Sequence, residues 1–158
     1  LFRWLMGDFE EAFGMLSTYY WKIDVEDNAF ALFQTAGGQT ASMHTSWTQW
    51  EKLFSFEIFG EAGYLVVEGL GGSYGTETLK IAKRRCATRY AGSAPDEKVI
   101  EFPGPDISWE AEWREFLSTI KEKRDPMGNG KDGLEANRMI KAVYTSAREN
   151  RPIKISEQ

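Results

Sequence analysis

The sequence is poor in the residues that build metal sites, disulfides and catalytic triads. Its 158 residues include one cysteine, Cys86, and one histidine, His44. A single cysteine cannot form an internal disulfide, which is typical of a reducing compartment, so a cytoplasmic location is expected. Zinc centres and Ser-His-Asp triads need more of these residues than the chain offers. We therefore predict no metal ligands and assign no residue of this chain a catalytic role.

Long apolar runs and an excess of positive charge are also missing. No apolar run approaches the roughly 20 residues that cross a bilayer, and the N-terminus does not have the pattern of a signal peptide. The formal net charge is -5, whereas nonspecific nucleic-acid binding requires clustered Lys and Arg. With 42% hydrophobic and 27% charged residues, the composition is that of a globular protein with neither nucleic acid nor membrane as a partner.

The chain reads as one domain that starts in the middle of a larger protein. No repeat or linker interrupts residues 1–158, and this length suits a single core. The segment from Leu1 to Gly7 resembles the last turns of a helix, ending at a glycine that can adopt a left-handed cap. It has no N-terminal cap ahead of its apolar residues. We therefore expect the natural protein to extend upstream of Leu1.

Alternating apolar residues and paired glycines predict a sheet over the first two thirds of the chain. The run from Leu16 to Trp21 is rich in strand-forming residues and is expected to be the first strand. Asn28 to Thr35 and Gln39 to Trp47 flank the turn Ala36-Gly37-Gly38 and predict a hairpin. Further strands are predicted at Leu53 to Phe59, Tyr64 to Glu68, Thr78 to Ala82, Ala87 to Tyr90 and Lys98 to Phe102.

Two amphipathic helices are predicted to follow the strands. The first begins at Ser108, the expected cap, and carries the stripe Trp109, Trp113, Phe116, Leu117 and Ile120. The second begins near Asp132, which is expected to form a capping box with Glu135, and ends at Asn150 and Pro152. The pattern predicts an α+β fold, a mostly antiparallel (mixed) open sheet with helices packed on one face and the other face left open.

Three stretches of the sequence resemble one known family. They are Leu1 to Asp8 (LFRWLMGD), Phe56 to Leu65 (FEIFGEAGYL), and the helical motifs Trp113 to Leu117 (WREFL), Asp132 to Ala136 (DGLEA) and Ser146 to Asn150 (SAREN). In order and spacing they are similar to the C-terminal domain of the glucose-fructose oxidoreductase, inositol dehydrogenase and MocA (Gfo/Idh/MocA) family. The resemblance covers essentially the whole chain.

The resemblance implies a parent enzyme that depends on NAD or NADP and acts on a sugar, polyol or related hydroxy compound. Family members carry a Rossmann domain, a Glu-Lys-Pro segment, and an Asp and His pair ahead of this domain. None of these is found in the sequence, so the chain is expected to bind no cofactor alone and to be inactive alone. The segment Gly69 to Gly75 contains several glycines, but no amphipathic helix follows it, so we interpret it as a loop. The resemblance also implies a homodimer formed through the open sheet face.

Four residues are candidates for contacts with the substrate. His44 alternates with Ser42 and Ser46 and is expected on the open face of the sheet, where it could border a pocket or a subunit contact. Trp47, Trp50 and Lys52 follow that strand, and aromatic rings near an amine can stack on and hydrogen-bond a sugar. For each residue the alternative is a structural role: a surface histidine, ordinary packing, or a solvated lysine. The alternative for the whole chain is a noncatalytic module for protein interaction or dimerisation.

Overall fold

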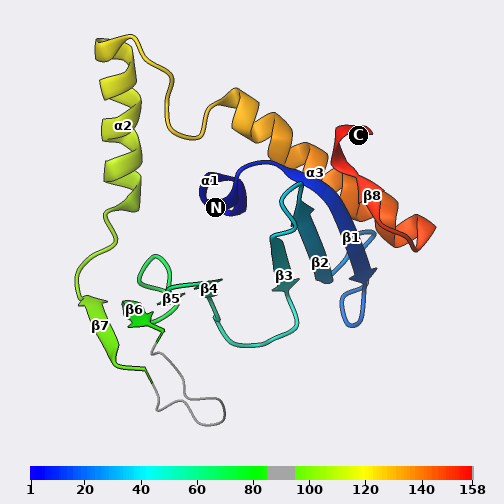
Figure 1. Ribbon diagram of the computed structural model, residues 1–158, viewed down its shortest axis with the longest axis horizontal. Helices are drawn as coiled ribbons and strands as arrows, with labels where there is room; N and C mark the ends of the chain where they lie inside the picture. Colours follow the sequence, from blue (N-terminus) through cyan, green and yellow to red (C-terminus); the bar gives the residue numbers. More distant parts are fainter. Residues whose placement is uncertain (85–94, 158) are drawn as a thin grey trace. The chain divides into compact units, whose positions relative to one another are not determined.

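The computed structural model describes residues 1–84 and 95–157, which divide into two compact units (Figure 1). The first unit comprises Leu1–Trp50 and Arg124–Gln158, and the second comprises Glu51–Lys123. Each unit contains one four-stranded antiparallel sheet. The predicted α+β class is therefore confirmed. The prediction of a single sheet with both helices on one face was wrong, because the strands divide between two sheets and the two long helices belong to different units. The predicted strand from Ala87 to Tyr90 lies outside the described residues.

In the first unit the strand order is β3-β2-β1-β8. The unit opens with the short helix α1 (Phe2–Met6), which ends at Gly7 with a φ of 78°. The strands are β1 (Phe9–Ser17), β2 (Asn28–Thr35), β3 (Thr40–Ser46) and β8 (Ile153–Lys154), and the 3-10 helix η1 (Ile155–Glu157) closes the chain. The predicted hairpin corresponds to β2 and β3 and is confirmed. The prediction of a first strand from Leu16 to Trp21 was wrong beyond Ser17, because the chain leaves the sheet there.

Helix α3 (Gly130–Glu149) packs against β1 and covers one face of this sheet (Figure 1). Small residues allow this close approach: Gly14 faces Val143, and its backbone N–H donates to Oγ of Ser146 at 3.0 Å. The Ser146 hydroxyl is fully buried and donates to the carbonyl oxygen of Arg151 at 2.6 Å. Buried polar groups need such partners, so Ser146 fastens the helix to both β1 and the chain after it.

The other residues of the core surround this contact. Phe2, Phe9 and Phe33 pack with ring centroids 5.8–6.3 Å apart, and Ile153 is buried beside them in the same cluster. Burying such side chains contributes about 1.5–3 kcal/mol each. Asn129 caps α3 by accepting from the backbone N–H groups of the first turn, in a capping box with Asp132. The box thus lies one turn before the predicted pair of Asp132 and Glu135. Asn150 ends the helix, as predicted, and adopts the left-handed conformation.

The face of the sheet that α3 does not cover is apolar at its centre. Strand register places Met15, Phe30 and His44 in one row across the three strands, and Phe13, Leu32 and Ser42 in the next. Met15, Phe30 and Leu32 are all more than two fifths exposed. His44 shares this face, as the alternation along β3 predicts. The open face expected from the sequence therefore exists in the first unit.

The second unit contains β4 (Ser55–Gly60), β5 (Gly63–Glu68), β6 (Glu77–Lys83), β7 (Glu97–Phe102) and helix α2 (Ser108–Glu122). Its strands pair in sequence order, each antiparallel to the next. The glycine-rich segment after β5 leads into β6, so its interpretation as a loop is confirmed. Ile107, rather than the predicted Ser108, is the N-cap of α2, and the backbone N–H of Ser108 donates to Asp106 at 2.9 Å.

Candidate functional site

Two segments of the first unit meet at one edge of its sheet. Strands β1 and β3 are both antiparallel to β2, so they run in the same direction and end at the same edge. The connection of residues 18–27 leaves the end of β1, and residues 47–50 leave the end of β3. The backbone N–H of Trp47 donates to the carbonyl oxygen of Asp27 at 2.8 Å, and Nε1 of Trp21 donates to the carbonyl oxygen of Trp47 at 3.3 Å.

A buried carboxylate organises the first of these segments. The side chain of Asp27 accepts hydrogen bonds from the backbone N–H groups of Tyr19, Tyr20 and Trp21 at 2.8–3.0 Å, and from Nδ2 of Asn28 at 3.0 Å. Only 2% of Asp27 is exposed. Burial alone would raise the pKa of this carboxyl, but the four hydrogen bonds together hold it well below its usual range. Asp27 therefore carries its charge inside the protein and fixes three consecutive amides.

Three rings, which we term the aromatic cluster, are carried by these segments. The centroid of Tyr20 lies 5.0 Å from that of Trp50 and 5.2 Å from that of Trp21, and the two tryptophan rings are 6.2 Å apart. All three pairs have edge-to-face geometry, which suits the quadrupoles of aromatic rings. Tyr20 is 64% exposed and Trp50 is 68% exposed. The cluster is thus ordered by its own contacts while much of its surface faces solvent.

The backbone of Trp50 is strained. Its φ is 56°, in the left-handed region that bulky residues seldom occupy. This conformation costs about 1–2 kcal/mol for a residue with a Cβ atom. Residues with a strained backbone are common at binding sites, and they keep this conformation where the contacts around them stabilise it.

His44 is connected to the same edge through Asn28. Its ring stacks on Phe30, with centroids 4.1 Å apart and an interplanar angle of 9°. Its Nε2 lies 3.5 Å from Oδ1 of Asn28, whose Nδ2 donates to Asp27 and, at 2.8 Å, to Oγ1 of Thr48. The imidazole is therefore held between the apolar open face and a polar network that reaches the base of the aromatic cluster.

The four predicted site residues are divided between the two units. Trp50 joins the aromatic cluster, His44 reaches it through Asn28, and Trp47 lies in the same segment with a 76% exposed ring. Lys52 belongs to the second unit, where its Nζ lies 6.0 Å from the ring centroid of Tyr74. The structure brings three of the four to one edge of one sheet.

Sequence reasoning missed three residues of this site. Tyr20 and Trp21 were expected in a strand, but they lie in the connection that follows β1. Asp27 was not among the predicted site residues; it is buried, because the amides of residues 19–21 need an acceptor once they leave the sheet. An aspartate directly before a strand and after a loop of aromatics is the sequence signal, since short acidic side chains often accept from nearby amides.

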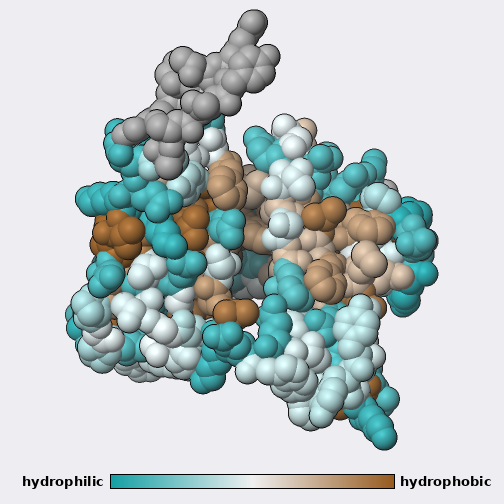
Figure 2. Space-filling view, turned by 90° about the horizontal axis from the view of Figure 1, so that it is seen from below, coloured by the Kyte–Doolittle hydropathy of each residue, from teal (hydrophilic) through white to brown (hydrophobic). Residues whose placement is uncertain are grey.

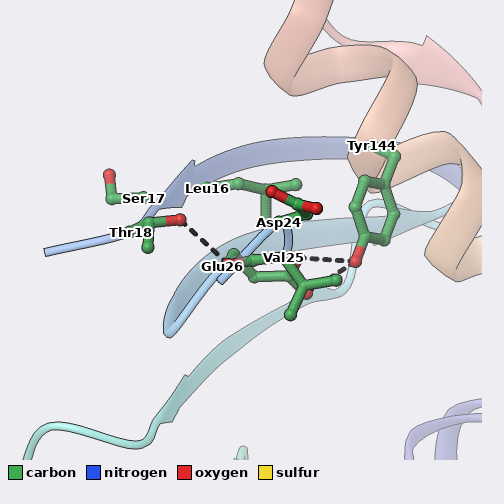
Figure 3. Close-up of a pocket in the computed structure, with 7 residues that line it drawn as sticks. All are labelled: Leu16, Ser17, Thr18, Asp24, Val25, Glu26 and Tyr144. Atoms are coloured by element: carbon green, nitrogen blue, oxygen red, sulfur yellow. Dashed lines mark hydrogen bonds between the residues drawn. The ribbon is translucent and has the colours of Figure 1, made fainter. Parts of the chain in front are cut away.

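A shallow hollow of about 270 Å³ lies between the connection of residues 18–27 and α3 (Figure 3). The hydroxyl of Tyr144 donates to both carboxylate oxygens of Glu26 at 2.6–2.7 Å, and Oγ1 of Thr18 donates to the carbonyl oxygen of Val25 at 2.9 Å. The hydrogen bond to Glu26, with a smaller effect of burial, raises the pKa of Tyr144. The hydrogen bonds between Tyr144 and Glu26 thus hold the connection of residues 18–27 against α3.

Residues 1–84 and 95–157 contain neither a cluster of metal-ligating side chains nor a membrane-spanning helix. No group of three or more His, Cys, Asp or Glu side chains there is arranged to hold a metal ion. Over the same residues, neither the length nor the apolar character of any helix suffices to cross a bilayer.

A family model matches the N-terminal part of the chain. Residues 1–66 match the model of the GFO/IDH/MocA C-terminal domain. The resemblance inferred from the sequence is confirmed by this match. No curated protein matches the sequence.

Solved structures of oxidoreductases share the fold across nearly the whole chain. A protein from Desulfitobacterium hafniense DCB-2 is 18% identical with a TM-score of 0.81, over 99% of this chain and 45% of that one. An oxidoreductase from Agrobacterium radiobacter, solved with NAD+, L-tartaric acid and magnesium, is 18% identical with a TM-score of 0.73, over 99% of this chain and 46% of that one. Levoglucosan dehydrogenase, solved with NADH and levoglucosan, is also 18% identical with a TM-score of 0.76, over 97% of this chain and 46% of that one. The chain spans somewhat less than half of each of these proteins.

Proposed function

We propose that this chain is the substrate-side and assembly domain of an NAD- or NADP-dependent oxidoreductase that acts on a sugar, polyol or related hydroxy compound. The observation that supports this most directly is the match of residues 1–66 to the GFO/IDH/MocA C-terminal domain, together with the shared fold along the remaining chain. Under this proposal residues 1–158 work as one C-terminal domain. Its single cysteine suits a cytoplasmic location.

The nicotinamide cofactor is assigned to the part of the parent outside this chain. A dinucleotide site needs a glycine-rich turn between a strand and a helix, whose N-terminus faces the pyrophosphate. In the described residues, the glycine-rich segment from Gly69 to Gly75 joins strand β5 to strand β6 instead. These residues do not fit the cofactor, so we assign no cofactor-binding or catalytic residue to them. The chain alone is expected to be inactive.

Substrate contacts are assigned to the edge where β1 and β3 end. Trp47 and Trp50 offer exposed rings there, and His44 offers a ring nitrogen beside Asn28. Lys52, which belongs to the second unit, is proposed separately as a candidate for a substrate contact. Such a site binds and orients a hydroxy compound, whereas hydride transfer needs a cofactor held against the reacting carbon. Binding and chemistry are thus divided between this chain and the rest of the parent.

The open face of the first sheet is assigned to a homodimer. Phe13, Met15, Phe30 and Leu32 form an apolar centre there, and exposed apolar patches are a mark of interaction surfaces. Figure 2, a space-filling view from below, shows apolar residues in brown at the surface of the molecule. A two-fold axis would bring the same patch of each copy together. Sedimentation of the chain should show a dimer that Phe30→Glu converts to monomer.

The decisive experiment is an NADH and NADPH titration of the intact parent. Saturable quenching or enhancement of nicotinamide fluorescence is expected for one of the two cofactors, and the 158-residue chain alone should give none. The rival function is a noncatalytic interaction module. It predicts no binding by the parent, and an open reading frame without a Rossmann pattern upstream of Leu1 would favour it.

A further inference from the structure

The aromatic cluster has a feature that packing alone does not explain. Tyr20 and Trp50 leave about two thirds of their surface in solvent, although large aromatic side chains stabilise a fold mainly when they are buried. The backbone that carries them is nevertheless held tightly. Asp27 fixes the amides of Tyr20 and Trp21, and Trp50 keeps a φ of 56°.

We propose that the aromatic cluster of Tyr20, Trp21 and Trp50 is a stacking surface for the ring form of a sugar, and that Asp27 is the residue that positions it. This inference rests on the proposed function and narrows its substrate class from hydroxy compounds in general to cyclic sugars. It adds Tyr20 and Trp21 to the residues that contact the substrate, and Asp27 as a residue that positions them.

The chemistry of a sugar ring matches the surroundings of the cluster. A pyranose with equatorial hydroxyls presents a flat patch of C–H groups, and the negative face of an aromatic ring attracts such weakly positive hydrogens. Its hydroxyls point outward, toward polar side chains. Lys22, Asp24 and Gln49 belong to the same two segments and are exposed. An open-chain polyol has the same hydroxyls but no fixed apolar face.

The area of the cluster favours a small ligand over a protein. One aromatic side chain buries roughly 150–250 Å² at most, so three partly packed rings offer well under about 750 Å². A stable protein interface needs about 800 Å² from each partner. A monosaccharide, by contrast, needs only one or two rings to cover its apolar face.

Asp27 acts through its neighbours and touches no ligand in this scheme. Its carboxylate is buried beneath the connection and accepts from the amides of Tyr19, Tyr20 and Trp21. A carboxylate can accept all of these bonds, whereas an amide of the same shape replaces one acceptor oxygen by a donor group. Asp27→Asn should therefore free at least one amide and loosen the rings without removing any of them.

The test is an NMR titration of the 158-residue chain with methyl β-D-glucopyranoside and, separately, with sorbitol. The indole N–H signals of Trp21 and Trp50 should shift saturably with the pyranoside, at millimolar concentrations, and at least tenfold less readily with sorbitol. Trp50→Ala should weaken pyranoside binding at least tenfold. The matched control is Trp109→Ala, which removes a tryptophan from α2 that is 79% exposed, against 68% for Trp50, and should leave binding unchanged.

The role of Asp27 has its own readout. In Asp27→Asn, pyranoside affinity should fall severalfold while the Trp21 and Trp50 signals broaden and the Trp109 signal stays sharp. Should this variant not fold, Trp50→Gly tests the same surface, because glycine relieves the strain and removes the ring.

Three results would overturn the proposal: equal responses to pyranoside and sorbitol, pyranoside binding that survives Trp50→Ala, or concentration-dependent pairing of chains that Trp50→Ala abolishes. Because no cofactor is present, failure here is distinct from failure of the parent to bind NADH or NADPH.

Discussion

Replacing Gly14 with alanine should weaken the attachment of α3 to β1. A Cβ atom at this position would lie 2.6 Å from Cγ1 of Val143 and 2.8 Å from its carbonyl oxygen. The second contact is with backbone, so a change of rotamer cannot relieve it, and α3 must move away from the sheet. This movement would also stretch the 3.0 Å hydrogen bond from Gly14 N–H to Oγ of Ser146.

The expected loss of stability follows from these contacts. Overpacking a core costs roughly 1–3 kcal/mol, and weakening a buried hydrogen bond costs about 1 kcal/mol. Alanine recovers about 0.5 kcal/mol relative to glycine in a strand. The free energy of unfolding should therefore fall by about 1.5–3.5 kcal/mol. With a slope near 2 kcal/mol/M, the urea midpoint of the first unit should fall by about 0.8–1.8 M.

The assay is urea unfolding followed by circular dichroism, with Gly133→Ala as the matched control. Gly133 lies within α3, and nothing lies within 4 Å of a Cβ atom built there. Since alanine favours a helix more than glycine, this variant should gain about 0.5–1 kcal/mol. Replacing glycine with alanine should thus lower the free energy of unfolding at Gly14 and raise it at Gly133. A Gly14→Ala protein as stable as the wild type would refute the close packing of α3 on β1.

Three further predictions concern single side chains. Asn129→Ala should destabilise α3 by about 1 kcal/mol in urea unfolding, because the capping box is lost. Glu26→Gln should lower the pKa of Tyr144 in an ultraviolet titration, since the charged acceptor that raises it is removed; an unchanged tyrosine profile would contradict the pairing. The folded-state pKa of Asp27 lies below the ordinary 3.8, so its stabilisation is complete above pH 3.8 and disappears as pH falls through the folded value. The difference in unfolding free energy between wild type and Asp27→Asn should therefore be constant at neutral pH and shrink in acid.

The elements with regular patterns were predictable from the sequence. The hairpin of β2 and β3, the strands β4 to β7 and both long helices lie close to their predicted positions, because alternation and amphipathic stripes are local properties of the chain. The ends of elements were harder to predict. β1 stops at Ser17 although Tyr19, Tyr20 and Trp21 favour strands, since Asp27 offers their amides a better partner than the sheet does.

The sequence predicted only part of the candidate site. Trp47, Trp50 and His44 could be proposed because aromatic and imidazole groups near a strand end suit substrate contacts. Tyr20 and Trp21 could not, because their proximity to Trp50 depends on the parallel course of β1 and β3. Lys52 was proposed with the tryptophans on sequence distance, but it lies in a different compact unit from Trp50.

The sequence by itself determined the α+β class, the order of strands and helices, and the open apolar face, since each follows from the periodicity of neighbouring side chains. Only the tertiary structure decided how the strands divide into two sheets, that the Asp27 carboxylate is buried, and that Tyr20, Trp21 and Trp50 form one cluster. Tyr20 and Trp50, for example, lie 30 positions apart in the sequence. A sequence pattern shows which side chains favour burial. It does not show which strands or side chains pair, because the pairing depends on long-range contacts that together must satisfy every buried polar group.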